Sequence, residues 1–290
     1  MPNNIAKYKN YTTLLDEVFM LSALTGVLES DASTARQGAN ANEILIPKME
    51  MDGLGDYDRS NGYPEGDVTL TLETKTFNYE RGRMFTIDYV DNEESAGVAY
   101  GNLAGEFIRT KVVPEADAFR FATYTGKSKA GMRANGALTD GNAVYDAVVA
   151  GITALDEAQV PASARYLFIT PTAHNALMAR DDYKSRELIN SFAGIVKVPQ
   201  SRFCSAITLN TGDGNKGGYE KASGAVDINF MIIYKPAVIQ FTKHVAPKVI
   251  TPEQNQTADA WKYGYRVYSL VDAYDNKLDG IYVHTKEALA

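Results

Sequence analysis

The chain has 290 residues with 45% hydrophobic and 22% charged residues, an ordinary composition for a folded protein that excludes wholesale disorder. Its single cysteine, Cys204, excludes internal disulfides and multi-cysteine zinc or iron–sulfur sites. The formal net charge is −7, and residues 50–94 hold 12 Asp/Glu against 4 Lys/Arg, whereas a nucleic-acid-binding protein should show a basic patch.

The first predicted element is a helix over residues 13–25. Thr13 and Asp16 are spaced as a capping box, the apolar residues that follow recur at roughly helical spacing, and Gly26 is a natural stop. Two interpretations remain open, a docking helix or a helix that packs on its own core. Residues 31–42 are small and polar without a period, which predicts an extended arm or linker.

Residues 43–90 predict strands separated by turns. Apolar residues alternate with polar ones near Ile44, over 68–72 and over 85–89, with a turn at Glu80–Arg83. Residues 52–67 hold four glycines and one proline, too many for a packed core, and the segment is too long for a tight hairpin. We therefore predict a long acidic β-excursion that projects from the body. Such projections usually bind a partner or move.

A helical pattern returns over residues 92–124 and carries an unusual glycine stripe. Gly97, Gly101 and Gly105 lie at i, i+4 and i+8, where each glycine costs about 1 kcal/mol relative to alanine, so another backbone should approach closely there. Pro114 should kink or restart the helix. If continuous, it spans on the order of 50 Å, which suits a strut better than an enzyme core.

The second half alternates helices and strands. We predict a helix over 142–158 capped by Asn142, and a strand over 166–170 that leads into a helix ending near Arg180. Further strands are predicted at 195–198, 207–209, 228–234, 261–267 and 280–284, with a glycine-rich loop at 211–218. The fold class is α+β, arranged as two lobes.

No motif carries catalytic chemistry. The loop at 211–218 lacks the order of a phosphate-binding loop, because Lys216 precedes the closing glycines and no hydroxyl residue follows it. An EF-hand starting at Asp56 would place Asn61 and Asp67 where glycine and glutamate are required, so a solvated tip is favoured over a loose divalent-cation site. The three histidines lack metal-ligand spacing. No apolar run approaches the roughly 18 residues of a membrane helix. We predict no catalytic residue, cofactor, metal or membrane contact.

Six stretches together form a recognisable pattern: IPKMEMDGLGDYDR (46–59), GDVTLTLETKTF (66–77), RGRMFTIDYVDNEE (81–94), GNLAGEFIRTKVVPEADAFRFATYT (101–125), RYLFITP (165–171) and YRVYSLVDAYDNKLDGIYVH (265–284). The pattern resembles the major capsid proteins of tailed bacteriophages, the Hong Kong ninety-seven phage fold, and most resembles those of phages of Gram-positive bacteria. The resemblance covers nearly the whole chain.

The resemblance implies an anatomy. Residues 1–42 would be the N-terminal helix and arm, 43–90 an extended loop that lies across a neighbouring subunit, 91–134 and 246–290 a peripheral domain with a long spine helix, and 135–245 an axial domain. Subunit contacts are expected at the loop tip, from Asp52, Asp56, Tyr57, Asp58 and Arg59. The glycine-rich loop is expected near the capsomer axis, through Gly212, Asp213, Gly214, Gly217 and Gly218.

The acidic extended loop needs basic partners on an adjacent subunit, since like charges within one subunit only repel. We expect Arg109, Lys111 or Arg120 of the spine to face it. Some members of the family crosslink a lysine of this loop to an asparagine of a neighbour. Only Lys48 and Lys75 lie in the segment and neither aligns with a crosslinking motif, so that activity is not carried over.

The resemblance implies a non-enzymatic shell protein that self-assembles into hexamers and pentamers around double-stranded DNA, which it does not bind sequence-specifically. A separate scaffolding protein and a portal are expected partners, decoration proteins are left open, and the protein would be a virion component assembled in the host bacterial cytoplasm. Two alternatives remain: an encapsulin-type bacterial nanocompartment shell with a cargo enzyme, and an enzyme with a ligand site at 211–218.

Overall fold

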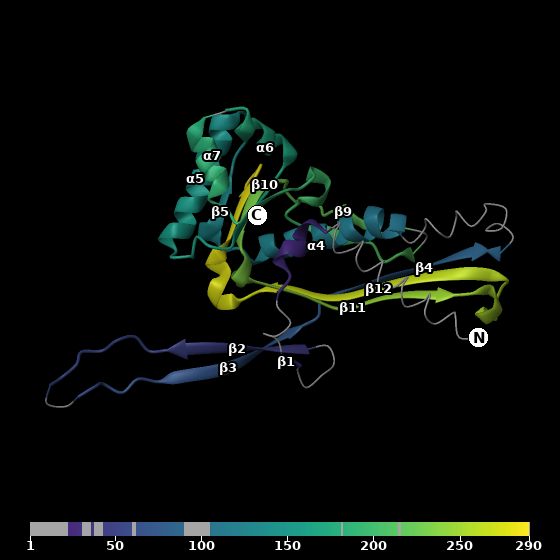
Figure 1. The fold of residues 1–290 in the computed structure, drawn as a ribbon, viewed down its shortest axis with the longest axis horizontal. Helices are drawn as coiled ribbons and strands as arrows, with labels where there is room; N and C mark the ends of the chain where they lie inside the picture. The colour runs from purple at the N-terminus through teal and green to yellow at the C-terminus, as the bar shows by residue number, and fades with distance from the viewer. Residues whose placement is uncertain are drawn as a thin grey trace.

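The computed structural model is a mixed α and β structure built around two sheets (Figure 1). Within the described residues, no helix is long and apolar enough to cross a membrane. The structure describes residues 23–30, 36–37, 43–59, 62–89, 105–180, 182–213 and 216–289.

A long three-stranded sheet forms one half of the molecule. Strands β11 (Val238–Ile250), β12 (Ala260–Ala273) and β4 (Tyr79–Asp88) pair antiparallel in the order β11-β12-β4. The predicted turn at Glu80–Arg83 is wrong, because these four residues lie inside β4 and pair with residues 265–268 of β12. Polar side chains and a glycine suggested a turn. Gly82 instead allows close packing, since an added Cβ would lie 3.0 Å from the Tyr265 carbonyl oxygen.

A helical strut runs along this sheet (Figure 1). Its described part runs from Gly105 through a π-helical turn at Ile108–Val112 (η3) and continues as α4 (Val113–Lys127), a length of about 35 Å. The π-helical turn ends two residues before Pro114, which lacks the amide hydrogen that a regular helix uses. The predicted irregularity at Pro114 is therefore present. Gly97 and Gly101 lie outside the described residues.

The second sheet belongs to an α/β lobe. Its strands are β5 (Arg133–Asn135), β6 (Arg165–Ile169), β7 (Gly194–Lys197), β10 (Ile228–Tyr234) and β13 (Ile281–Thr285), in the order β5-β13-β10-β6-β7. The central β10 has the continuous apolar sequence INFMIIY, and all its residues except Tyr234 are buried. Such a run is typical of a strand that is covered on both faces. The strands predicted at 195–198, 207–209, 228–234 and 280–284 are confirmed to within one residue.

Three helices cover one face of the lobe sheet (Figure 1). They are α5 (Gly141–Glu157), α6 (Pro171–Met178) and α7 (Tyr183–Asn190). The predicted cap of α5 is wrong by two residues, because the Asp140 carboxylate, not Asn142, accepts from the Ala143 amide at 2.8 Å. The sequence also missed α7, whose N-cap is Asp182.

The strut α4 packs against both sheets. Its Phe121 and Tyr124 enter a core with β6, β10 and β13 of the lobe, including Phe168, Met231 and Val283. Earlier residues of the strut, from Ile108 to Ala116, form a separate core with Tyr79, Tyr263 and Tyr265 of the long sheet. A third core lies between the lobe sheet and α5–α7. The strut is therefore the element that joins the two halves.

The chain enters this body through a short 3-10 helix, η1 (Leu24–Leu28). The prediction that Gly26 ends a helix is wrong, since Gly26 lies inside η1, and the rest of the predicted helix lies outside the described residues. The fully buried Asp117 of α4 holds η1 in place: its carboxylate accepts from the amides of Leu24 and Thr25, both at 3.1 Å, and from the Thr25 hydroxyl at 2.6 Å.

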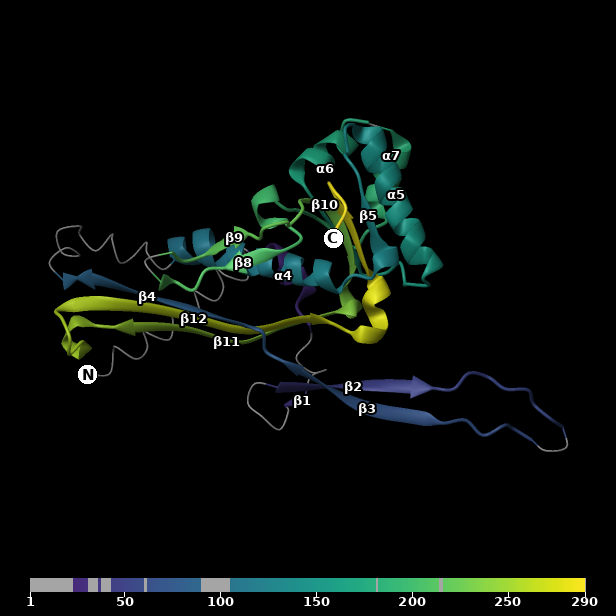
Figure 2. The same ribbon diagram turned by 180° about the vertical axis from the view of Figure 1, so that it is seen from behind.

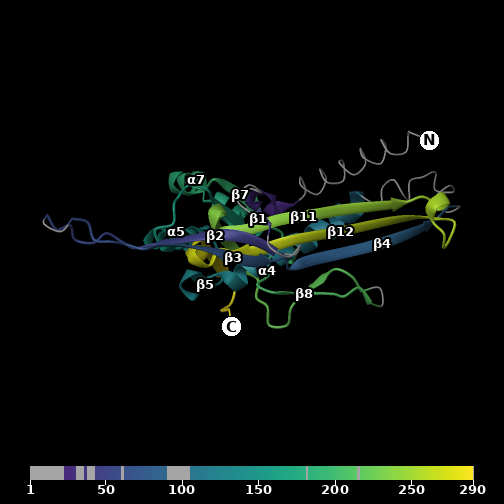
Figure 3. The same ribbon diagram turned by 90° about the horizontal axis from the view of Figure 1, so that it is seen from below.

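A two-stranded ribbon projects from the body (Figure 2). Strands β2 (Glu43–Met51) and β3 (Val68–Thr76) pair antiparallel along their whole length, and the short β1 (Arg36–Gln37) pairs with the base of β2. Figure 3 shows the ribbon extending away from the long sheet of β4, β11 and β12. The predicted projecting β-excursion is confirmed.

The predicted domain boundaries need correction. The boundary between 245 and 246 falls inside β11, and β13, which was assigned to the peripheral domain, lies in the lobe sheet between β5 and β10. All five residues of β13 are buried in that sheet. The remaining elements are a hairpin of β8 (Ile207–Leu209) and β9 (Tyr219–Lys221), with 3-10 turns at Ala130–Met132, Gln200–Arg202, Lys235–Ala237, Pro252–Gln254 and Asp275–Gly280.

Candidate functional site

One face of the β2–β3 ribbon is apolar and exposed. The register places Pro47 opposite Leu72, Met49 opposite Leu70 and Met51 opposite Val68, so these six side chains share a face. The two methionines and the three β3 residues are 50–68% exposed. A two-stranded ribbon is at best marginally stable alone, and an apolar patch of this kind usually marks an interaction site. We call this surface the ribbon face.

The ribbon ends in the acidic tip, residues 52–67. The Asp52 carboxylate accepts from the Asp67 amide at 2.9 Å and closes the base of the tip. The rings of Tyr57 and Tyr63 lie 4.8 Å apart, and Leu54 is fully exposed. The predicted contact residues Asp52, Asp56, Tyr57, Asp58 and Arg59 are all exposed here. Their role in subunit contact stays a prediction.

The base of the ribbon is fixed by a buried ion cluster. The Lys75 ammonium lies 2.6 Å from a Glu73 carboxylate oxygen, 3.2 Å from Asp272 and 3.4 Å from Asp275. Burial alone would lower the pKa of Lys75, but the hydrogen bonds with Glu73 and Asp272 outweigh it and raise the pKa above its usual value. Lys75 is therefore a structural residue in the subunit and is not free for crosslinking.

The glycine-rich loop joins β8 to β9 and lies against β4. The Arg81 guanidinium donates to the carbonyl oxygens of Asn210 at 2.8 Å and Gly218 at 3.3 Å, and Arg83 donates to that of Gly212 at 3.3 Å. Gly212 and Gly218 have φ of +95° and +86°, a conformation that favours glycine. Sequence reasoning did not foresee this contact with the long sheet.

The other residues predicted in the glycine-rich loop are Asp213, Gly214 and Gly217. The Asp213 carboxylate accepts from the Thr211 hydroxyl at 2.8 Å, and a Cβ added at Gly217 would lie 3.7 Å from an Arg83 nitrogen. Gly214 lies outside the described residues. The position of this loop in a capsomer stays a prediction.

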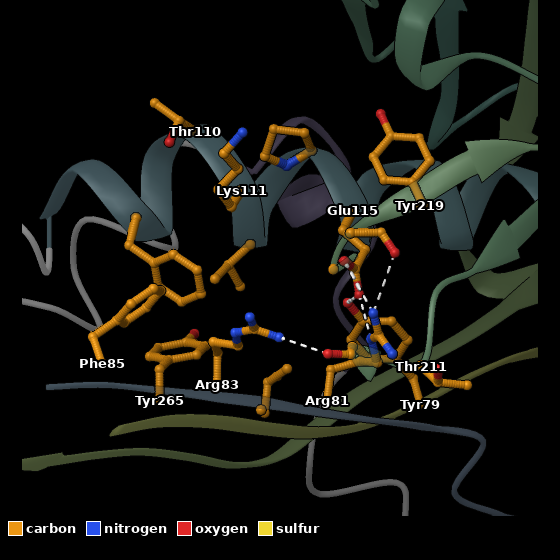
Figure 4. Close-up of a pocket in the computed structure, with 18 of the residues that line it drawn as sticks. Tyr79, Arg81, Arg83, Phe85, Thr110, Lys111, Glu115, Thr211, Tyr219 and Tyr265 are labelled. Atoms are coloured by element: carbon orange, nitrogen blue, oxygen red, sulfur yellow. Dashed lines mark hydrogen bonds and ion pairs between the residues drawn. The ribbon is translucent and has the colours of Figure 1, made fainter. Parts of the chain in front are cut away.

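A cavity of about 1120 Å³ lies between the strut, β4 and the glycine-rich loop (Figure 4). One wall is β4, which presents alternate side chains, and the opposite wall is the strut around the π-helical turn. The loop forms the third wall. The labelled lining residues come from these walls and from β12 and β9: Tyr79, Arg81, Arg83, Phe85, Thr110, Lys111, Glu115, Thr211, Tyr219 and Tyr265.

Two opposite charges in the cavity wall, those of Arg81 and Glu115, neutralise each other. Arg81 binds Glu115 with Nε 2.6 Å from a carboxylate oxygen, and the Tyr79 hydroxyl donates to the same oxygen at 3.2 Å. Burial, with the charge of Glu115, raises the pKa of Tyr79 well above its usual value. This group is held neutral and serves to fix β4 to the strut.

The three basic residues expected to face a neighbouring subunit, Arg109, Lys111 and Arg120, differ in their exposure and in their partners. Arg120 is buried and donates to the Thr25 hydroxyl at 2.8 Å, so the expectation that it faces a neighbouring subunit is wrong. Arg109 is exposed but pairs with Glu106 one turn earlier at 2.5 Å. Lys111 is exposed at the wall of the cavity.

Among the described residues, nothing lies close to the Cβ position of Gly105. No described atom lies within 4 Å of a Cβ added there, so Gly105 does not allow a close approach of any described segment of the same chain. Close packing by Gly97, Gly101 and Gly105 stays a prediction for contacts between subunits.

Burial shifts the pKa values of three residues whose side chains can be reactive, Cys204, His174 and His284. Burial raises the pKa of the Cys204 thiol, which keeps it protonated near neutral pH. Burial lowers the pKa of both His174 and His284. In the part of the chain that the structure describes, no group of three or more His, Cys, Asp or Glu side chains is placed to hold a metal ion.

No protein-family model and no curated protein matches the sequence. Among solved structures, the fold is similar to a chain of Mycobacterium phage Che8, with a TM-score of 0.62 and 13% identity over 91% of this chain and 90% of that chain. The mature capsid of bacteriophage PhiM1 gives a TM-score of 0.57 at 11% identity, over 86% of this chain and 83% of that chain. A virus-like particle from Pyrococcus furiosus gives 0.52 at 11% identity, over 93% of this chain and 98% of that chain.

These similarities extend over 86–93% of the chain. The predicted fold class is confirmed: the protein has the α+β fold of the Hong Kong ninety-seven type.

Proposed function

We propose that this protein is the major capsid protein of a tailed bacteriophage and assembles with copies of itself into the hexamers and pentamers of an icosahedral shell. It would be a virion component with a structural, non-enzymatic role. The fold similarity supports this assignment, because the solved neighbours include a phage capsid and a virus-like particle.

The observation that carries the proposal is the exposed ribbon face. Five apolar side chains of Met49, Met51 and β3 are at least half exposed on a ribbon with no core of its own. Burying apolar surface contributes about 25 cal/mol per Å², so covering this face by a neighbouring subunit would stabilise both the ribbon and the assembly. A protein that worked as a monomer would gain nothing from this surface.

The shell would enclose double-stranded DNA without reading its sequence. The net charge of −7 supports this, since a lining that bound DNA tightly would need clustered cations. We include in the proposal a separate scaffolding protein and a portal as partners, assembly in the host cytoplasm, and a Gram-positive host. These rest on the sequence resemblance.

Electron microscopy of the purified protein, expressed alone and together with its neighbouring genes, tests the proposal. Shells, tubes or rings of six subunits are expected. Particles that contain DNA would distinguish a phage capsid from the second candidate, a nanocompartment shell, which the similarity to the Pyrococcus furiosus particle favours and which would contain a cargo protein. A chain that stays monomeric or dimeric in both preparations would contradict both.

Shortening the ribbon tests the role of its tip. Met51 and Val68 pair across the ribbon, so residues 52–67 can be replaced by Asn-Gly, which forms a two-residue hairpin turn. We expect a folded subunit with the circular dichroism spectrum of the wild type and no stable shells. Gly53→Ala is the length-matched control, because an added Cβ there meets nothing within 4 Å. Normal shells from the shortened chain would contradict the assigned role.

A further inference from the structure

We propose that the cavity between the strut, β4 and the glycine-rich loop binds a small molecule that carries both a phosphate group and an aromatic ring, of the class of a nucleoside monophosphate. The cavity lies within a single copy of the chain, so the inference goes beyond the proposed function and does not depend on assembly. The phosphate of the ligand would lie between Arg83 of β4 and Lys111 of the strut.

The lining of the cavity is basic, although the chain as a whole has a net charge of −7. Four basic and two acidic side chains line it. Both acidic side chains are already paired, Glu115 with Arg81 at 2.6 Å and Glu106 with Arg109 at 2.5 Å. An excess of positive charge in a concave site favours an anionic ligand.

Two of the remaining basic side chains are available to a ligand. Lys221 is paired with Asp227 at 2.6 Å. By contrast, neither Arg83 nor Lys111 forms an ion pair with any described residue, and the Lys111 ammonium donates no hydrogen bond to one. They come from opposite walls, Lys111 from the strut and Arg83 from β4 (Figure 4). A phosphate monoester carries about 1.5–2 negative charges at pH 7, so these two cations would neutralise it.

The glycine-rich loop holds Arg83 in place. Gly212 has a φ of +95°, its carbonyl oxygen accepts from Arg83 at 3.3 Å, and a Cβ added there would lie 3.1 Å from a guanidinium nitrogen. A guanidinium has five N–H donors, and this hydrogen bond uses one of them. Because Arg83 is half-buried, its other donors gain from an acceptor inside the cavity, and a phosphate offers three oxygens.

The strut is irregular where it forms the opposite wall. The π-helical turn at Ile108–Val112 contributes Thr110 and Lys111 to the lining. Such turns inside α-helices often occur at functional sites. The ion pair between Arg81 and Glu115 links β4 to the strut, so the two walls keep their separation without a ligand. The site is therefore formed before a ligand binds, as small-molecule sites usually are.

Aromatic side chains lie beside Arg83 in the cavity. Phe85 and Tyr265 adjoin it in Figure 4, and the centre of the Phe107 ring lies 4.8 Å from that of Phe85 and 6.1 Å from that of Tyr265. Phe85 and Phe107 are only partly buried, so part of this aromatic cluster is open to the cavity. A nucleobase stacks favourably on such side chains. The surfaces for the phosphate and for the ring are therefore adjacent, as the two parts of a nucleotide are.

The form of the cavity favours a free nucleotide over a nucleic-acid duplex or an inorganic ion. Its volume of about 1120 Å³ slightly exceeds the usual range of small-molecule sites, about 300–1,000 Å³, so a nucleotide would fit together with bound water. A duplex keeps its bases stacked inside the helix and cannot offer a ring to Phe85 together with a phosphate to Arg83. Inorganic phosphate alone would leave the aromatic side chains uncovered.

Isothermal titration calorimetry of the purified full-length chain tests the proposal, with the monophosphates of adenosine, guanosine, cytidine and thymidine as probes. At least one should bind saturably, and about tenfold more tightly than its own nucleoside or than inorganic phosphate, because only the nucleotide contacts both surfaces of the site. Absence of saturable binding by all four, or a nucleotide that binds no more tightly than its nucleoside or than phosphate, overturns the proposal.

Substitutions separate the phosphate contact from a folding effect. Lys111→Gln and Arg83→Gln should each weaken nucleotide binding about tenfold and leave nucleoside binding unchanged, which also shows that the cavity is intact. Lys111→Arg keeps the charge and should bind the nucleotide within about threefold of the wild type. Lys184→Gln, at an exposed lysine of α7, is the control and should not change the affinity. Wild-type affinity in both glutamine variants overturns the proposal.

Photolabelling locates the site. The azido derivative of the nucleotide that binds should, on irradiation, modify peptides that contain residues 79–85, 106–115 or 211–219, and an excess of the unmodified nucleotide should prevent this. Label found only on other peptides overturns the proposal. Failure of the chain to form shells would instead overturn the proposed function, since nucleotide binding is measured on the unassembled chain.

Discussion

Six of the seven residues of β10 are buried in the α/β lobe, whereas all five residues from Val68 to Leu72 in β3 are exposed on the ribbon. Both strands are apolar enough to form a core. The lobe strand is covered within the subunit by the strut on one face and by α5–α7 on the other. The ribbon has no such cover. The lobe strand is therefore stabilised within the subunit, whereas under the proposed function the ribbon would be covered by a neighbouring subunit.

This contrast predicts that mutations will divide into two classes. Substitutions in the lobe and strut should lower the free energy of unfolding of the subunit, and those on the ribbon should lower assembly alone. The expected effects on unfolding run from several kcal/mol to nearly zero.

The largest effect is expected for Phe121→Ala. Phe121 is fully buried between the strut and the lobe, with its ring centre 4.9 Å from that of Phe203 and 5.2 Å from that of Phe168. Removing a buried phenyl ring costs about 3–5 kcal/mol. Urea unfolding of unassembled subunits, followed by circular dichroism, should show this loss. Phe121→Leu retains most of the volume and should lose markedly less. A loss below 1 kcal/mol for the alanine variant would mean that the strut does not join the two cores.

The next effect is expected for Asp117→Ala. The Asp117 carboxylate is fully buried, accepts three hydrogen bonds from Leu24 and Thr25, and lies 3.3 Å from Arg202. Removing it leaves two amides, a hydroxyl and a guanidinium without this acceptor, which should cost roughly 3 kcal/mol. Hydrogen exchange should also become faster at the amides of Leu24 and Thr25. Asp117→Asn keeps an acceptor and should lose less. Equal losses in the two variants would contradict the role assigned to the carboxylate.

The sequence predicts best those elements whose signal is local. The INFMIIY run of β10 and the apolar spacing of α5 are sufficient to place them, because strand and helix periodicity are properties of neighbouring residues. Helix α7 was missed because YKSRELIN has few apolar residues. Asp182, whose carboxylate accepts from the Ser185 amide at 2.7 Å, is the capping signal that could have identified it.

The cavity could not be predicted from the sequence, since its walls come from three separate segments near residues 79–85, 106–115 and 211–219. Pairing of β4 with β12 brings the first segment to the others, and that pairing is set by residues about 185 positions apart. The sequence did contain one indication of the β4 wall. Tyr79, Arg81, Arg83 and Phe85 alternate as one face of a strand does, but polar neighbours and Gly82 suggested a turn.

A smaller, pH-dependent effect is expected for Asp227→Asn. Burial would raise the pKa of Asp227, but hydrogen bonds from Lys221 at 2.6 Å and Lys286 at 2.9 Å outweigh it and hold the pKa below its usual value. A lowered pKa in the folded state stabilises the protein above the unfolded-state value near pH 3.8, and the contribution is lost as the pH falls through the folded-state value. Because the group is partly exposed, the loss at pH 7 should be about 0.2–1 kcal/mol. Urea unfolding of both proteins between pH 7 and pH 3 should show the difference shrinking, and a difference that grows in acid would contradict the ion pairs.

The smallest effect on the subunit, and the sharpest test of the contrast, is expected for Leu70→Glu on the ribbon face. Leu70 is 60% exposed and lies opposite the exposed Met49, so the substitution removes no core contact and should change the free energy of unfolding by less than about 0.5 kcal/mol. In the assembly, the same carboxylate would be buried against a neighbour without a partner, which is strongly unfavourable. Light scattering and electron microscopy should therefore show loss of particles from a subunit whose urea midpoint is unchanged. Thr71→Glu, on the polar face of the same strand, is the matched control and should assemble. If Leu70→Glu unfolded as easily as Phe121→Ala, the ribbon would belong to the subunit core after all; if it formed normal particles, the ribbon face would not be the surface that joins one copy to the next.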